Sequence, residues 1–234
     1  MRVALITGAS KGFGLALATS LVEDGWSLVV DGRAEAVLDD AVGTLRAASE
    51  GQAVLGIAGD VADPAHRAAL AAAVTSLGRL DLLVNNASTI GPSPQPLLAD
   101  YPLGEFERVL AVNLVAPLAV VQATLPLLRS TRGVIVNVTS DAGVEGYAGW
   151  GGYGASKAGL EQLSNVLAAE EPDIRVYWFD PGDMRTEMHQ AAFPGEDISD
   201  RPSPETVVPA LRRLLHEAPP SGRFRAAELL EVAP

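Results

Sequence analysis

Tyr153 and Lys157, in the segment 146–159 (GYAGWGGYGASKAG), form a pair that could move a proton. Side chains four residues apart on a helix lie above one another, so the spacing predicts an ammonium beside a phenol. A nearby positive charge stabilises a phenolate and lowers the phenol pKa from its ordinary value of about 10. Only Lys11 and Lys157 among the 17 basic residues are lysines, and lysine, unlike arginine, can release a proton. The alternative is a lysine on a wet helix face beside an ordinary tyrosine.

A second segment, 7–14 (TGASKGFG), has the composition of a loop that binds phosphate. Its glycines, Gly8, Gly12 and Gly14, let the chain turn sharply and bring its backbone close to a ligand. They lie between an apolar run and a helical pattern, where the free N–H groups of a helix N-terminus attract a diphosphate. The spacing GxxxGxG differs from the usual dinucleotide fingerprint GxGxxG. The alternative is a strand–helix turn that binds nothing.

The segment 29–33 (VVDGR) predicts which dinucleotide would bind. An acidic residue at this strand end binds a free ribose 2′-hydroxyl, whereas an arginine accommodates a 2′-phosphate. Alternation along the strand predicts that Asp31 and Arg33 share one side, with Gly32 leaving space for a phosphate. Lys11 adds a second cation. We therefore predict a preference for NADP(H), with NAD(H) as the alternative if Asp31 dominates.

Alternating strand and helix patterns must position these residues. Strands are predicted over 2–7, 27–32, 53–60, 80–88, 133–140, 174–182 and near 223–230, and helices over 14–25, 34–48, 64–78, 103–129 (bent near Pro117), 153–170 and 203–215. Apolar runs without alternation indicate strands buried on both faces, and strand–helix alternation indicates parallel βαβ units. The fold class is therefore α/β: a Rossmann-type, doubly wound parallel sheet with helices on both faces. No linker divides residues 1–234, which we interpret as a single domain.

Composition limits the partners and the compartment. The net charge of −12 repels phosphate backbones, so we predict no nucleic-acid partner. Cysteine is absent, which excludes disulfides and thiolate metal sites and fits a reducing compartment. We predict a cytoplasmic protein without a metal site. No segment approaches the ~20 uninterrupted apolar residues that span a bilayer, and the apolar stretch 15–22 is interpreted as a buried helix face rather than an export signal.

Six motifs occur in a fixed order: TGASKGFG (7–14), NNAS (85–88), Asn113, Ser140, YGASK (153–157) and PGDMRT (181–186). Together they resemble the short-chain dehydrogenases/reductases of the short, single-domain type, over roughly residues 2–217. The resemblance implies about seven parallel strands and hydride transfer between a nicotinamide cofactor and a carbonyl compound or alcohol. It makes a sugar-nucleotide epimerase an unfavourable alternative, because those proteins carry a larger C-terminal region. The rival class is a non-catalytic NADP(H)-binding sensor.

The resemblance also implies a role for each matching residue. Tyr153 would be the general acid or base, Ser140 would bind the substrate oxygen, Lys157 would lower the tyrosine pKa and hold the nicotinamide ribose, and Asn113 would anchor a water. Asp60 would bind the adenine amino group and Thr186 the nicotinamide carboxamide or the diphosphate. The full set of implied cofactor contacts is Gly8, Ser10, Lys11, Gly12, Phe13, Gly14, Arg33, Asp60, Val61, Asn86, Ala87, Tyr153, Lys157, Pro181, Gly182, Met184 and Thr186.

The sequence departs from the family in two places that concern the substrate side. Ser88 stands where the family usually has glycine, and the segment 186–204 is short and rich in glycine, proline and acid, as expected of a mobile lid or a solvated loop. Pocket walls are predicted from 88–94, 142–152 and 183–192, with Tyr147, Trp150, Met184, Met188 and Phe193 favouring an uncharged, partly apolar carbonyl compound or alcohol. Apolar helices 103–129 and 153–170 predict a homodimer or homotetramer.

Overall fold

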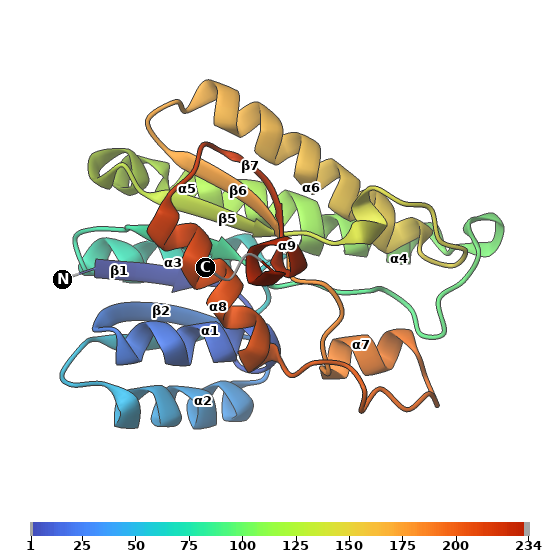
Figure 1. The fold of residues 1–234 in the computed structure, drawn as a ribbon, viewed down its shortest axis with the longest axis horizontal. Coiled ribbons are helices and arrows are strands. Elements are labelled where there is room, and N and C mark those ends of the chain that lie inside the picture. Colours follow the sequence, from blue (N-terminus) through green and yellow to red (C-terminus); the bar gives the residue numbers. More distant parts are fainter. Residues whose placement is uncertain (1, 232–234) are drawn as a thin grey trace.

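Seven parallel strands form one sheet in the order β3-β2-β1-β4-β5-β6-β7 in the computed structural model, which describes residues 2–231 (Figure 1). The strands are β1 (Arg2–Ile6), β2 (Trp26–Gly32), β3 (Val54–Ala58), β4 (Leu82–Asn85), β5 (Val134–Val138), β6 (Arg175–Asp180) and β7 (Gly222–Arg225). Every neighbouring pair is parallel, as the alternating pattern predicts. The predicted doubly wound α/β fold is confirmed.

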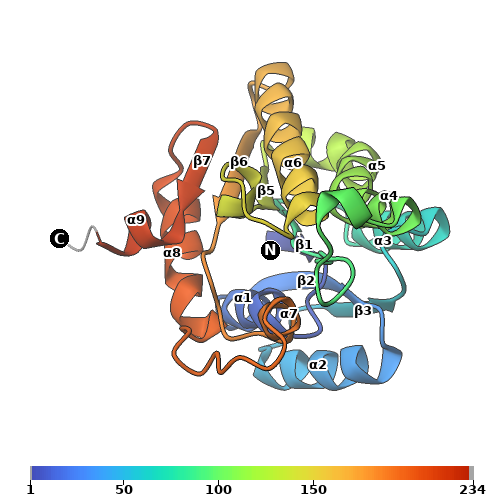
Figure 2. The same ribbon diagram turned by 90° about the vertical axis from the view of Figure 1, so that its right-hand side faces the viewer.

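Helices cover both faces of the sheet because each buried strand has two apolar faces (Figures 1 and 2). In β1, Ala4 and Ile6 belong to the core that packs against α1, α2 and α8, whereas Val3 and Leu5 belong to the core that packs against α3, α5 and α6. The helices are α1 (Gly12–Glu23), α2 (Glu35–Ala48), α3 (Pro64–Ser76), α4 (Leu103–Leu110), α5 (Ala116–Thr131), α6 (Gly151–Glu170), α7 (Glu187–Ala192), α8 (Pro204–Glu217) and α9 (Ala226–Glu231).

The long helix predicted over 103–129 is interrupted before Pro117 rather than bent at it. One π-helical turn, Ala111–Val115, joins α4 to α5, and the N–H of Ala116 donates to the carbonyl of Ala111 five residues earlier. Proline has no N–H to give to the residue four positions before it, which here is Asn113. Such wide turns often occur at functional sites, and this one carries Asn113.

Two segments differ from the sequence prediction. The segment predicted as a lid or loop contains a short helix, α7, whose first turn is capped by the Thr186 hydroxyl accepting from the N–H of His189 at 3.2 Å. The strand predicted near 223–230 ends at Arg225, and the chain continues as α9. The prediction was wrong there because AAELLE, the sequence of α9, consists of strong helix formers.

Among residues 2–231, one continuous helical stretch, Leu103–Thr131, is long and apolar enough to span a membrane by length and composition. The sequence analysis overlooked it because isolated polar residues interrupt the apolar run. Its most apolar window has a mean hydropathy of 1.8 and is 44% buried inside the protein. Val120, Val121 and Leu128 of this stretch pack in the core beneath the sheet.

Candidate active site

A cavity of about 1210 Å³ opens at the carboxyl ends of the strands. The strand order reverses between β1 and β4, which are neighbours in space although β2 and β3 intervene in sequence. Open α/β sheets bind ligands in the crevice outside such a switch point. Figures 1 and 2 show α7 beyond these strand ends, in front of α1 and β2. The cavity runs from the glycine loop to α7.

At Gly8 and Gly14 the glycine loop is packed so closely that a side chain would not fit. Gly8 has φ +66°, a left-handed conformation that glycine adopts readily. A Cβ on Gly14 would lie 2.5 Å from the Gly8 carbonyl oxygen and 2.6 Å from Asn86 Nδ2. Asn86 Nδ2 donates to the carbonyls of Thr7 and Gly8 at 2.9 and 3.0 Å, and the Thr7 hydroxyl accepts from the N–H of Asn86 and of Ala87. The residues that follow β4 thus hold the loop that follows β1 through hydrogen bonds.

Asp31 supports the glycine loop from below instead of facing the ribose. It is 1% exposed; one carboxylate oxygen accepts from the N–H of Gly8 and the other lies 2.9 Å from Nε2 of buried His66 on α3. Asp31 and Arg33 both line the cavity, but both oxygens of Asp31 are engaged, one by the N–H of Gly8 and the other by His66. The space beyond Gly32 is also filled, since a Cβ there would lie 2.6 Å from the Ser10 side chain.

The two cations predicted for the 2′-phosphate have different surroundings. Arg33 is exposed, lines the cavity and has no hydrogen bond or ion pair with any residue between 2 and 231. Lys11 also lines the cavity, but its ammonium pairs with Glu187 at the start of α7. Arg33 is therefore the freer of the two, and Lys11 links the glycine loop to α7.

Asn113 lies behind the cavity wall and uses its whole side chain for structure. Its oxygen accepts from the N–H of Thr89 at 2.8 Å and from the hydroxyl of Ser88 at 3.1 Å, and its Nδ2 donates to the Thr89 carbonyl and to Ser156. Ser88, which departs from the family's glycine, is accommodated by this bond. The π-helical turn thereby fixes the loop after β4 against α6.

Ser140 and Tyr153 meet at one end of the cavity, and both line it. Ser140 follows β5, where its side chain accepts from the N–H of Ala142 at 3.2 Å. Tyr153 lies in the first turn of α6 and is 8% exposed. The Ser140 hydroxyl donates to Asp141 Oδ1 at 2.8 Å, and its nearness to Tyr153 lowers the pKa of that phenol. The hydroxyl of the neighbouring Thr139 donates to Glu161 at 2.8 Å.

The pKa of Tyr153 is raised above its ordinary value, opposite to the direction predicted from Lys157. Burial is the main cause, because a desolvated phenolate is unfavourable. The nearness of Ser140 lowers the pKa, while the charge of Asp180 and, less strongly, of other nearby carboxylates raises it. The prediction was wrong in direction because it considered one cation and not the burial or the acids. Tyr153 consequently holds its proton at neutral pH.

Lys157 is also buried, at 2% exposure, and its ammonium lies 5.4 Å from the centre of the Tyr153 ring. Its Nζ donates to the carbonyl of Val138 at 2.7 Å. Burial lowers the pKa of Lys157 to about 8, and the charges of Asp180 and Glu161 oppose this shift. The i, i+4 spacing read from the sequence therefore does bring the ammonium to the phenol.

Asp180 was missed by the sequence analysis, although a polar residue at the end of an apolar strand is a recognisable signal. It is 4% exposed and accepts from the N–H of Gly182 at 3.0 Å and from Arg223 of β7 at 3.0 Å. Arg223 also donates to Glu161 at 3.0 Å. The ion pairs join β6, β7 and α6, so no single segment of sequence reveals the partners of Asp180.

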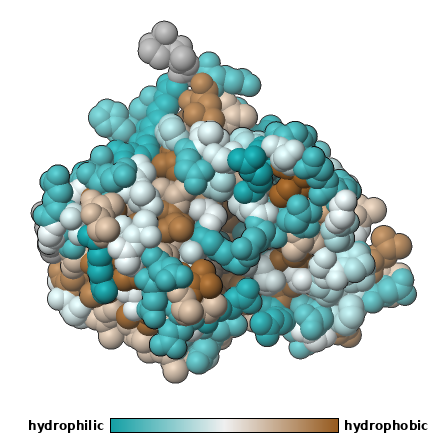
Figure 3. Space-filling view, turned by 90° about the horizontal axis from the view of Figure 1, so that it is seen from below, coloured by the Kyte–Doolittle hydropathy of each residue, from teal (hydrophilic) through white to brown (hydrophobic). Residues whose placement is uncertain are grey.

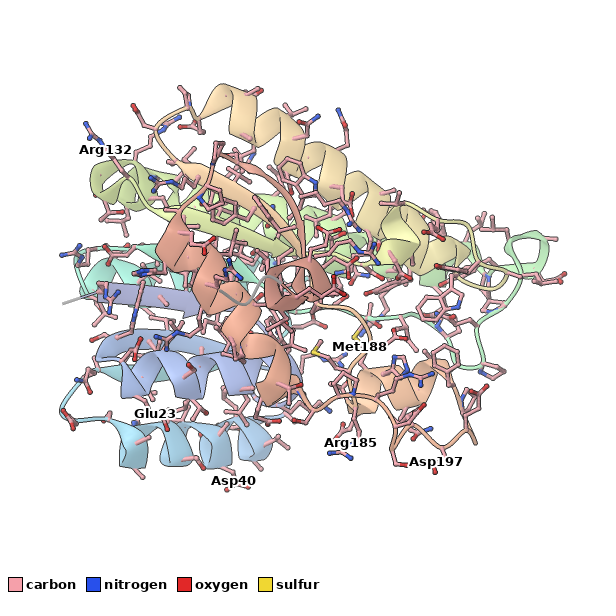
Figure 4. All side chains as sticks on the ribbon, in the orientation of Figure 1. Glu23, Asp40, Arg132, Arg185, Met188 and Asp197 are labelled. Carbon is pink, nitrogen blue, oxygen red and sulfur yellow. The ribbon has the colours of Figure 1, made fainter. Side chains whose placement is uncertain are left out.

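Aromatic and sulfur-containing side chains line the cavity next to Tyr153. Trp150 meets the Tyr153 ring edge-on at 5.6 Å, and Met188 of α7 packs in the same small cluster. Figure 4 shows Met188 on the side of α7 that faces the sheet, whereas Arg185 and Asp197 point outward. Tyr147 lines the cavity too, but its hydroxyl donates to Asp141, which raises the pKa of Tyr147 to about 12.

Most predicted site residues line this one cavity, and two do not. Those that do are Gly8, Ser10, Lys11, Gly12, Phe13, Arg33, Asp60, Val61, Asn86, Ala87, Ser140, Tyr153, Lys157, Pro181, Gly182, Met184 and Thr186. Gly14 lies beneath the glycine loop and Asn113 behind the wall, because each is packed against backbone. Of the predicted pocket walls, Ser88 and Ile90 line the cavity, whereas 91–94 do not. One carboxylate oxygen of Asp60 accepts a hydrogen bond from the N–H of Ala62 at 2.9 Å.

A family model for short chain dehydrogenases matches residues 2–197. The chain belongs to the short-chain dehydrogenases. Mouse (Mus musculus) sepiapterin reductase is 35% identical to this short-chain dehydrogenase over 201 residues, which cover 81% of this chain and 77% of the relative. The benzil reductase ((S)-benzoin forming) of Saccharomyces cerevisiae is 34% identical over 222 residues, which cover 91% and 81%. A short chain dehydrogenase from Escherichia coli in complex with NADPH has a TM-score of 0.89 at 30% identity, covering 96% of both chains. The protein is thus an oxidoreductase of this family.

Proposed function

We propose that the protein is an NADP(H)-dependent oxidoreductase that reduces a ketone or aldehyde to an alcohol, or performs the reverse reaction. The observation that carries the proposal is the meeting of Ser140, Tyr153 and Lys157 at one end of a cavity whose other end holds the glycine loop and Arg33. The residues fit a nicotinamide dinucleotide, because the loop backbone is close to the cavity and the N-terminus of α1 has no side-chain cap.

The bound cofactor would supply the hydride, and the chain's own residues would hold and protonate the substrate. The Ser140 hydroxyl, which donates to Asp141 at 2.8 Å in the structure, would turn to donate to the substrate carbonyl oxygen. Tyr153 would give that oxygen its proton. The raised pKa of Tyr153 suits the reductive direction, since the phenol keeps the proton it must donate. Lys157, with its pKa lowered to about 8, would return the proton to the tyrosine and bind the nicotinamide ribose.

The preference for NADP(H) rests on Arg33, which lies free at the end of β2, and on Asp31, whose oxygens are engaged elsewhere. An arginine at this position accommodates a 2′-phosphate. The NADPH complex of the related Escherichia coli protein is in accord with this preference. NAD(H) remains the second cofactor to test.

The substrate class follows from the aromatic end of the cavity. Trp150, Met188 and Phe193 line it, which favours an uncharged, partly aromatic carbonyl compound. Two relatives named as reductases, of sepiapterin in mouse and of benzil in yeast, agree with reduction as the direction. We further propose that the chain acts in the cytoplasm as a single domain, on small molecules rather than nucleic acid or membrane.

One experiment tests the function against the non-catalytic alternative. NADPH and NADH are each titrated into the protein by nucleotide fluorescence, and NADPH oxidation is then followed with benzil and with simple aldehydes. We expect tighter binding of NADPH and turnover that falls about 10²- to 10⁴-fold in Tyr153→Phe with NADPH binding unchanged. Binding without turnover by the wild type would favour the sensor, and no binding of either nucleotide would refute both.

We also propose that the protein is a homodimer or homotetramer. Val115 and Leu118 of the long helix and Val166 of α6 are large apolar side chains that are 53%, 36% and 45% exposed. Burying them against a second copy would remove this apolar surface from water. Light scattering should give at least twice the 24.3 kDa chain mass; a monomer would contradict the proposal.

A further inference from the structure

His189 of α7 lines the cavity, and its ring nitrogen Nε2 is buried without a hydrogen-bond partner among the described residues. Its side chain is 9% exposed, and Nε2 has no hydrogen bond with any residue in the described range 2–231. Nearly all buried polar atoms in proteins are hydrogen-bonded, so each exception calls for an explanation. Three other buried side-chain atoms share this condition, in Gln95, Tyr101 and Arg201, but within that range only His189 also lines the cavity.

The other contacts of the His189 side chain do not explain why this residue is a histidine. Nδ1 lies 3.7 Å from Asp183, which in turn lies 3.7 Å from Arg201. Both distances exceed a hydrogen bond, and neither contact involves Nε2. The backbone N–H of His189 is bonded to the Thr186 hydroxyl. A phenylalanine or leucine could fill the same space, so packing alone does not require an imidazole.

A row of aromatic rings connects His189 to the catalytic tyrosine. Tyr153 meets Trp150 at 5.6 Å, Trp150 meets Phe193 at 5.9 Å, and Phe193 meets His189 at 4.8 Å between ring centres. All four side chains line the cavity. A flat aromatic body could lie along this row with its carbonyl at Tyr153, because aromatic rings pack favourably edge-to-face and offset. Its remote end would then reach His189.

We propose that His189 binds a hydroxyl group at the end of an aromatic aldehyde or ketone that lies remote from the reacting carbonyl. The proposal rests on the proposed function and adds a substrate-recognition residue to it. A neutral imidazole nitrogen either donates or accepts a hydrogen bond depending on its tautomer, and a hydroxyl does both. A hydroxyl therefore satisfies Nε2 in either tautomer, whereas a hydrogen atom at that position leaves it unpaired.

The test compares two probes, biphenylcarboxaldehyde and its counterpart with a para-hydroxyl on the remote ring. In the wild type we expect kcat/KM with NADPH to be about tenfold higher for the hydroxylated probe, because the other leaves a buried polar atom unpaired. In His189→Leu the ratio should fall to about one, because no imidazole remains to bond the remote hydroxyl, and NADPH binding should be unchanged. His189→Gln, which keeps a donor and an acceptor, should restore part of the preference.

The matched control is His216→Leu, which removes an exposed imidazole at the end of α8, away from the cavity. It should keep the wild-type ratio. Equal kcat/KM values for the two probes in the wild type, or a preference that survives in His189→Leu, would overturn the proposal. So would failure to bind or reduce either probe; reduction of benzil by the same preparation would then leave the proposed function standing, and absence of NADPH binding would refute that as well.

Discussion

The two halves of the cavity are built differently. The cofactor half consists of strand ends and a glycine loop that are tied to the sheet by buried hydrogen bonds from Thr7, Asp31 and Asn86. The substrate half depends on the six-residue helix α7, which is tied by its Thr186 cap, by the exposed pair Lys11–Glu187 and by Ser93 donating to the Ala191 carbonyl at 2.7 Å. Figure 3 shows hydrophilic and hydrophobic residues mixed over the face that α2 and α7 form.

This difference suggests that the two halves contribute differently to the stability of the fold and to the choice of substrate. A change in the cofactor half disturbs the packing of the sheet, so it should affect folding and nucleotide binding together. A change in the substrate half disturbs a few surface contacts, so it should affect substrate choice with little effect on stability. Four predictions test this comparison, in decreasing order of the expected change in the free energy of unfolding or binding.

In Lys157→Met, the free energy of unfolding should lose the part of its pH dependence that comes from the titration of this lysine. Between pH values of about 8 and 10.5 the unfolded chain binds this proton more tightly than the folded one, so wild-type stability rises with pH there. Relative to the variant, the wild-type free energy of unfolding should rise by about 2 kcal/mol from about pH 7 to about pH 9.5. Urea unfolding at several pH values measures this; parallel curves for the two proteins would show that Lys157 is not held at a lowered pKa.

Gly14→Ala should weaken the cofactor half through its backbone. The added Cβ would lie 2.5 Å from the Gly8 carbonyl oxygen, so the loop or α1 must shift. We expect a loss of about 1–3 kcal/mol in unfolding free energy, together with weaker NADPH binding. Gly43→Ala on exposed α2, where a Cβ meets nothing within 4 Å, is the control and should stabilise slightly. NADPH affinity that is equal in both variants would mean that the loop is not rigid.

Arg33→Ala should affect cofactor choice and not folding. Arg33 is exposed and makes no bond with another described residue, so its removal costs the fold little. The affinity for NADPH should fall about tenfold and that for NADH should not change, because only NADPH carries the 2′-phosphate. Arg175→Ala, at the amino end of β6 and away from the cavity, is the control. An equal loss for both nucleotides would contradict the assignment.

Glu187→Gln should have the smallest effect, since the Lys11–Glu187 side chains are 58% and 76% exposed. The stability change should stay below about 1 kcal/mol, and NADPH binding should tighten slightly because Lys11 is released. Raising the salt concentration should diminish the difference. Thermal unfolding and NADPH titration measure these effects, with Glu170→Gln as the control; a large loss of stability would show that α7 is tied as firmly as the cofactor half.

Local sequence patterns predicted most of the fold and most of the residues that line the cavity. Apolar runs of strand length, helix periodicity and glycine spacing act over a few residues, so they identify the sheet, the glycine loop and the Tyr153–Lys157 pair. α7 and α9 were missed because both are short, and a single turn or two of helix has little periodicity to detect. The family resemblance implied a shared site for Ser140 and Tyr153, and both line the cavity.

Only the tertiary structure decided how the charges and polar groups of separate segments combine. Asp31 contacts His66, which lies 35 residues away in the sequence. Asn113 binds the loop after β4 and does not line the cavity. The pKa of Tyr153 is raised because burial and the carboxylates of other segments outweigh the lysine on its own helix. The sequence by itself determined which groups are present and their local spacing; burial and long-range electrostatics depend on distances that exist only in the folded chain, and these decided what each group does.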